Sequence, residues 1–164
     1  MAGEISYQGN LATFGTPVSS TTTTPGVNDP EIGTRKLVGG VEYMFVYNAN
    51  NSAVSVGLGV TVVTNASSPY SITITTVTSL DMVVGVGHVS IATAAYGWVV
   101  TKGRCTVKAM ATSGTILENE PFYIAANGLF APASNTTGTD CNYVGKAMAD
   151  IVSSATGWAI VNCF

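Results

Sequence analysis

Short runs of alternating apolar and polar residues follow one another along the chain beyond residue 40. The clearest is Tyr70–Val77, where Ile72 and Ile74 fall on one face of an extended strand. Clusters of Gly, Pro, Asn and Ser separate these runs, so we expect an all-β fold. The expected strands are Val41–Tyr47, Val54–Thr64, Tyr70–Val77, Met82–Val86, Val89–Ala92, Tyr96–Thr101, Cys105–Met110, Thr115–Leu117, Phe122–Ala126, Leu129–Ala131, Tyr143–Ala147, Met148–Val152 and Trp158–Phe164.

The chain also repeats itself. Val83–Val100 and Tyr143–Ile160 share Val, Gly, Ile, Ala, Gly and Trp at matching positions, at an interval of sixty residues (143 − 83). Self-similarity at a fixed interval indicates one supersecondary unit used twice. We therefore expect a compact β-barrel or β-sandwich built from two related β units, at about 41–104 and 105–164.

The repeat carries two further expectations. Trp98 and Trp158 are the only tryptophans and occupy matching positions, so we expect both to pack in the core. Sugar binding by an exposed tryptophan is the alternative. Lys146–Ser153 has helical propensity, but its counterpart Val86–Thr93 is rich in Gly and Val, which favours a strand for both.

Residues 1–40 differ from the rest of the chain. They hold three of the six prolines and a run of Ser and Thr, a composition that buries too little apolar surface to fold alone. We expect an extended N-terminal arm that precedes the β domain at 41–164 and docks on a neighbouring protein. A disordered tail is the alternative. The residues expected to contact the partner are Ile5, Tyr7, Leu11, Phe14, Arg35 and Lys36.

The charge content indicates a protein that works inside an assembly. Charged residues make up 9% of the chain, where about 25% is usual. No charged side chain lies between Glu42 and Asp81, and hydroxyl and amide groups are buried against a partner at low cost. An uncharged but solvated surface is the alternative. The net charge of −3 and the lack of interleaved aromatics near Lys102, Arg104 and Lys108 argue against nucleic-acid binding.

The sequence also argues against a membrane protein and a secreted one. A membrane span needs roughly 20 mostly apolar residues, and the apolar runs here are shorter and interrupted. The first residues have neither the basic start nor the apolar stretch of a signal peptide, so we expect synthesis in a cytoplasm.

Few residues offer catalytic or metal-binding chemistry. A small hydrolase would need Cys105 or Cys141 beside His88, the only histidine, and no local signature supports that arrangement. With Cys163 included, the three cysteines are widely spaced and form no metal-ligand cluster. We expect buried, inert thiols, no metal, no cofactor and no enzymatic activity.

Glu118 and Glu120 are the remaining candidates, since two carboxylates two residues apart on a strand point the same way. A solvated turn before Pro121 is the preferred interpretation of this pair.

Three stretches resemble the small head proteins of tailed bacteriophages. The first is Ile32–Arg35 followed by Gly40–Ala49, and the second is Val84–Val86 followed by Tyr96–Val99 and Lys102-Gly103. The third is Ala109–Gly128, which contains Ile116-Leu117 and Phe122–Ile124. These stretches lie within residues 32–164, and they are patterns of turns and strands.

The resemblance implies a capsid decoration, or cement, protein. Such a protein binds the outer capsid surface as an oligomer, usually a trimer, with the major capsid protein as its partner. It bridges capsomers and stabilises the shell against internal DNA pressure, and the family has no catalytic residues. A receptor-binding module of a phage tail or fibre is the alternative, and it would bind saccharides or cells through exposed Trp or Tyr side chains.

Overall fold

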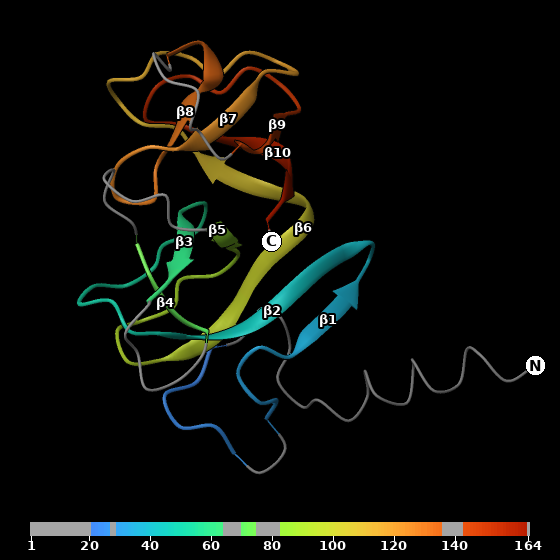
Figure 1. The fold of residues 1–164 in the computed structure, drawn as a ribbon, viewed down its shortest axis with the longest axis vertical. Helices are drawn as coiled ribbons and strands as arrows, with labels where there is room; N and C mark the ends of the chain where they lie inside the picture. The colour runs from blue at the N-terminus through green and yellow to red at the C-terminus, as the bar shows by residue number, and fades with distance from the viewer. Residues whose placement is uncertain (1–20, 27–28, 64–69, 75–82, 136–142, 164) are drawn as a thin grey trace, which may run out of the picture.

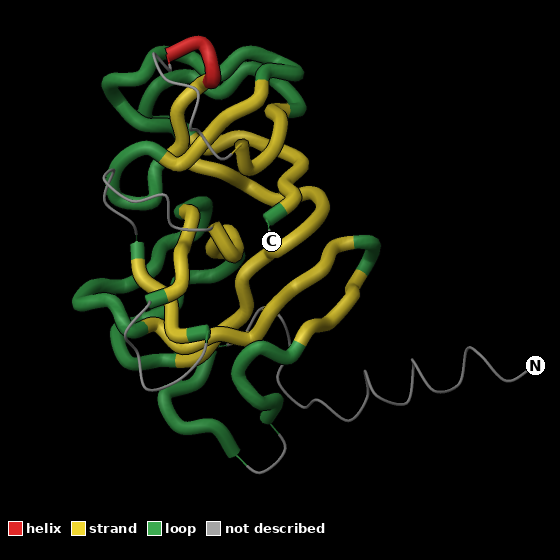
Figure 2. Tube along the Cα trace, in the orientation of Figure 1, coloured by secondary structure: helices red, strands yellow, loops and turns green. Residues whose placement is uncertain are grey.

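The computed structural model describes residues 21–26, 29–63, 70–74, 83–135 and 143–163, in which strands joined by turns and loops are the main regular structure (Figure 1). The strands are β1 (Arg35–Val38), β2 (Val41–Asn48), β3 (Gly59–Val62), β4 (Ser71–Thr73), β5 (Val83–Gly87), β6 (Tyr96–Lys108), β7 (Pro121–Ile124), β8 (Phe130–Pro132), β9 (Tyr143–Ala147) and β10 (Thr156–Asn162). One short 3-10 helix, η1 (Ala133–Asn135), follows β8 (Figure 2). The expected all-β fold is confirmed.

The five strands that follow β1 in the chain close into a barrel. The hydrogen-bonded order β2-β4-β3-β5-β6 returns to its start because β2 also pairs with β6. We call this closed five-strand barrel the first unit. The pair β2–β4 is parallel, and the other pairs of the barrel are antiparallel.

The strands of the C-terminal half repeat this connectivity. The order continues as β6-β10-β9-β7-β8, and a parallel bridge between Ala109 and Phe130 connects β8 to the end of β6. In this second unit the end of β6 takes the place that β2 has in the first unit. Likewise, β10 takes the place that the start of β6 has in the first unit. Figure 1 shows the long strand β6 running from one unit into the other. A single strand thus ends one unit and begins the next.

Local geometry confirms that the two units are copies. Ile91 and Ile151 each form an isolated bridge just before the last strand of their unit, to Val54 and Ile116 respectively. Added Cβ atoms on Gly97 or Gly157 would lie 2.8 Å and 2.6 Å from the Ile of the same unit. A close packing contact with isoleucine therefore requires glycine before each tryptophan. This requirement explains why the Gly-Trp pair occurs in both copies of the repeat.

A bulge in β6 exchanges the faces of that strand. Its register against β2 shifts between Glu42 and Tyr43, which are opposite Lys102 and Val100. Thr101 is the extra residue of this bulge. The even-numbered side chains before it, Trp98 and Val100, therefore face the same buried cluster as the odd-numbered Cys105 and Val107 after it. The largest cluster of buried side chains accordingly includes Trp98 from the first unit and Val107 from the second. This cluster spans both units, and a second cluster of buried side chains, which includes Val46, Val60 and Val99, lies within the first unit.

Several strand predictions differ from the structure. Tyr96–Thr101 and Cys105–Met110 are parts of one strand, because Lys102–Arg104 pair with β10 instead of forming a turn. Val89–Ala92 and Met148–Val152 are turns with one bridge each, since a residue with positive φ, Ala94 or Ser154, follows and bends the chain. Of Val54–Thr64, the strand covers Gly59–Val62.

The expected arm includes structure that joins the first unit. β1 forms a hairpin with β2 because Gly39 and Gly40 adopt positive φ and turn the chain back. Thr22 pairs with Tyr96 through two backbone hydrogen bonds of 3.0 and 2.7 Å. The segment 1–40 therefore contributes to the sheet before residue 40.

Candidate functional site

An outward face of the second unit is the candidate site. We call it the open face. It comprises the outward side chains of β10, of the second half of β6 and of the end of β9. The uninterrupted register places Arg104 opposite Ile160 and Thr106 opposite Trp158, and Lys146 lies opposite Ile160 from the other side. The open face consists of Lys102, Arg104, Thr106, Lys108, Lys146, Met148, Thr156, Trp158, Ile160 and Asn162.

Large apolar side chains are exposed at the centre of this face. Trp158 is 51% exposed, Ile160 is 54% exposed and Met148 is 40% exposed. The prediction that both tryptophans pack in the core is therefore wrong for Trp158 and correct for Trp98, which is fully buried. Contiguous exposed apolar groups on a soluble protein commonly mark an interaction site.

The repeat explains why one tryptophan is buried and the other exposed. In the first unit Phe45 lies opposite Trp98, and their ring centroids are 5.1 Å apart. In the second unit the matching position opposite Trp158 is Thr106, whose side chain provides no ring. The first unit also carries the extra strand β1, from which the Lys36 ammonium lies 5.6 Å from the Trp98 ring centroid.

Positive charge gathers around the exposed apolar groups. Four of the six cationic residues of the chain, Lys102, Arg104, Lys108 and Lys146, belong to the open face. The Arg104 guanidinium lies 4.3 Å from the centroid of the Trp158 ring, in a cation–π contact. Among the described residues none of these four cations forms an ion pair, although Lys102 lies opposite Glu42.

The open face contains part of a shallow hollow of about 460 Å³. Its lining includes Asn119, Lys146, Met148, Ile160 and Asn162. The lining thus combines apolar side chains with one ammonium and two amide groups, which suits a protruding side chain of a partner.

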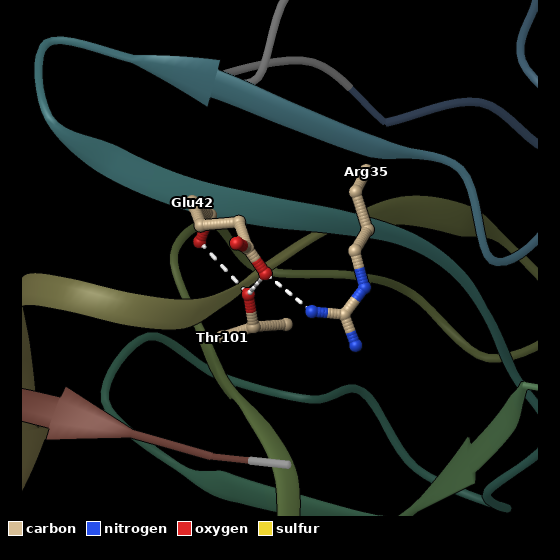
Figure 3. Close-up of polar contacts among 3 residues, drawn as sticks. All are labelled: Arg35, Glu42 and Thr101. Atoms are coloured by element: carbon tan, nitrogen blue, oxygen red, sulfur yellow. Dashed lines mark hydrogen bonds and ion pairs between the residues drawn. The ribbon is translucent and has the colours of Figure 1, made fainter.

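The residues predicted to contact a partner are elsewhere. Arg35 forms an ion pair with Glu42, and the Thr101 hydroxyl donates a 2.8 Å hydrogen bond to the same carboxylate oxygen (Figure 3). Lys36 lies over Trp98. The other predicted contacts, Ile5, Tyr7, Leu11 and Phe14, lie outside the described residues.

The Glu42 carboxylate should contribute a pH-dependent part of the stability. The Thr101 hydrogen bond, opposed by burial and assisted by Arg35 and Lys102, lowers the pKa of Glu42 below its ordinary value of 4.5. A depressed carboxyl pKa stabilises the folded state above the unfolded pKa, and this stabilisation is lost as the pH falls through the folded value.

Glu42→Gln should therefore lower the free energy of unfolding at pH 7 by up to about 1 kcal/mol, the range of a partly exposed pair. The difference from wild type should shrink towards pH 3, as followed by urea unfolding at several pH values. A difference that grows with acid would contradict the role of the carboxylate.

The candidate catalytic residues do not assemble into a reaction centre within the described residues. Burial raises the pKa of the Cys105 thiol to about 12, so this sulfur stays protonated at neutral pH. The His88 ring packs edge-on against Tyr43 with centroids 5.2 Å apart, and burial lowers its pKa. Cys163 is also a buried free thiol, and Cys141 lies outside the described residues.

The acidic pair serves a turn. The Glu120 carboxylate accepts hydrogen bonds from the backbone N–H groups of Leu117 and Ser134, at 2.9 and 3.2 Å. The Glu118 N–H donates to the Asp150 carboxylate at 2.8 Å. Across the described ranges no three His, Cys, Asp or Glu residues cluster as metal ligands, and no helix there is long and apolar enough to cross a membrane.

No protein-family model matches the chain, and no curated protein matches it either. Among solved structures, the head fibre gp8.5 N base of bacteriophage phi29 matches with a TM-score of 0.53 and 11% sequence identity. The match covers 73% of this chain and 94% of that chain. The chain has the fold of this head fibre base. A match over 73% of the chain is longer than residues 1–104, so it includes residues of both units.

The open face was missed by the sequence analysis, although a signal was present. Within Thr156–Asn162 the outward positions hold Thr, Trp, Ile and Asn, and the inward positions hold Ala159 and Val161. Both sets contain apolar residues, so alternation alone does not tell which face is buried. The exchange of Phe45 for Thr106 at matching positions is the signal that separates the two tryptophans.

Proposed function

We propose that the chain is a structural protein of a phage virion, attached to the outer surface of the head as an oligomer. The observation that carries this proposal is the match of 73% of the chain to a structure described as the base of a phage head fibre. The resemblance of residues 32–164 to small phage head proteins supports the same role. The finer proposal is a cement function, in which a homotrimer binds the major capsid protein and bridges capsomers.

A protein of this kind stabilises a shell by mass action. A ligand that binds the assembled shell, and not its dispersed subunits, shifts the equilibrium towards assembly by its binding free energy. Many equivalent sites and several subunits per oligomer add avidity to weak single contacts. Such a role needs no cofactor or catalytic residue, and we propose that the chain is not an enzyme.

Co-sedimentation with emptied heads of the phage that encodes the chain tests the proposal. We expect the full chain to sediment with the heads and to elute as a trimer in size exclusion with light scattering. A variant lacking residues 1–20 tests the proposed arm contacts, and it should keep its fold and lose affinity. A chain that stays in the supernatant at saturating concentration would refute head attachment.

A tail or fibre receptor-binding module is the second candidate, and the exposed Trp158 favours it, since tryptophan faces stack on sugar rings. It predicts binding of the chain to host-surface saccharides, lost in Trp158→Ala, and no binding to heads. A glycan array probed with both proteins separates the two functions.

A further inference from the structure

We propose that the open face of the second unit is the docking surface for an acidic protein surface on the head shell. The proposal rests on the proposed head attachment and names the surface and the chemistry that perform it. It differs from the sequence-based expectation, which placed the contacts in the arm and at Arg35 and Lys36.

The repeat supplies the first argument. Two units with the same connectivity present the same face, and the first unit buries the centre of it. Phe45, Trp98 and Val100 are 0% exposed, while the matching Thr106, Trp158 and Ile160 form a partly open surface. The second unit keeps the large apolar groups of this face without a cover in the described chain. A partner protein provides the cover for these apolar groups.

Charge supplies the second argument. The first unit has Tyr43 where the second has Arg104, since these residues lie opposite Val100 and Ile160. A chain of net charge −3 places four of its six cations on this one face. None of the four forms an ion pair among the described residues, and Lys102 acts electrostatically on Glu42, so Arg104, Lys108 and Lys146 remain available for carboxylates of a partner. The face therefore complements an acidic surface.

The arrangement of the side chains favours a protein partner over a saccharide. Trp and Arg are the residue types that most often dominate binding energy at protein interfaces, and here they are in contact at the centre. Met148 and Ile160 extend the apolar centre, and the lysines lie at its edge, where charges remain hydrated. The hollow beside Lys146 accepts an acidic side chain from the partner.

Titration of emptied heads with the full chain and its variants tests the docking surface. Trp158→Ala should weaken head binding at least tenfold, as expected for a central interface residue. The matched control is Leu37→Ala, because Leu37 on β1 is also 51% exposed and lies outside the open face. The control should bind heads as wild type does.

A second pair of variants tests the charges. Arg104→Glu combined with Lys146→Glu should weaken head binding at least tenfold and reduce its dependence on salt. Arg104→Lys combined with Lys146→Arg keeps both charges and should retain the salt dependence. A single cooperative thermal unfolding transition in every variant shows that the fold is intact.

The outcomes separate the possible occupants of the face. Wild-type binding that Trp158→Ala and the double Glu variant leave unchanged overturns the docking surface while head attachment stands. No wild-type binding refutes head attachment itself. A smaller molar mass of Trp158→Ala in light scattering would assign the face to contacts between copies, and loss of saccharide binding alone would assign it to a glycan. Either result overturns the proposal.

Discussion

Trp98→Ala should lower the free energy of unfolding by about 3–5 kcal/mol, the range for truncation of a large buried aromatic side chain. The Trp98 ring is fully buried, contacts Phe45 and belongs to the core cluster that joins the two units. Its removal leaves a cavity in a close-packed cluster that includes residues of both units, and the surrounding side chains can fill that cavity only in part.

Trp158→Ala is the internal control for this prediction. The two residues occupy matching positions of the repeat, but Trp158 is 51% exposed, so its truncation should cost less than about 1 kcal/mol. Trp98→Phe is a milder variant, because it keeps a ring and removes an indole N–H that has no hydrogen-bond partner. Urea unfolding followed by circular dichroism measures all three. Equal losses for both alanine variants would contradict the difference in burial.

Gly145→Ala should also destabilise the protein strongly, by about 2–3 kcal/mol. An added Cβ would overlap the Ile160 carbonyl oxygen and lie 2.9 Å from the Val161 Cα. Both are backbone atoms of the paired strand β10, so no side-chain rotation relieves the contact. The methyl group must push β9 away from β10 and weaken their antiparallel pairing.

Gly26→Ala provides the comparison for Gly145→Ala. Its added Cβ would lie 3.8 Å from the nearest atom, an oxygen of Asp29, which is an ordinary contact. The free energy of unfolding of this variant should lie within about 0.5 kcal/mol of the wild-type value. Thermal unfolding of the two alanine variants under one set of conditions tests the prediction. A Gly145→Ala protein as stable as Gly26→Ala would show that β9 and β10 adapt.

The fold class and the repeat are properties of local pattern, and the sequence predicts both correctly. Alternation of apolar and polar residues identifies strands because side chains point to opposite faces of a sheet. The Gly-Trp pairs at 97 and 157 mark the repeat because each glycine packs against an isoleucine of its own unit. These relations are short in sequence, so they are visible in it.

The joining of the units is less accessible to sequence. Lys102–Arg104 contain a glycine and two cations, which look like a turn between strands. In the structure they continue β6, because Asn162, Val161 and Ile160, which lie 56 to 60 residues further along the chain, pair with them. The hairpin at Gly39-Gly40 was not predicted either, because the segment before it is rich in Pro, Ser and Thr and was interpreted as an extended arm.

The candidate site depends on the same long-range relations. The identities of Trp158 and Arg104 are plain in the sequence, but their 4.3 Å contact exists because β6 and β10 are paired in one particular register. The bulge beside Thr101 then decides that Arg104 points outward while Val100 points into the core. Propensity at these positions does not distinguish these orientations.

By itself, then, the sequence determined an all-β chain made of two related units, poor in charge and without a recognisable catalytic motif. Only the tertiary structure decided that one strand serves both units, that Trp98 is covered, and that Trp158 is open beside four cations. The physical reason is that burial is a property of partners across strands. A tryptophan opposite Phe45 joins the core, and a tryptophan opposite Thr106 remains at the surface.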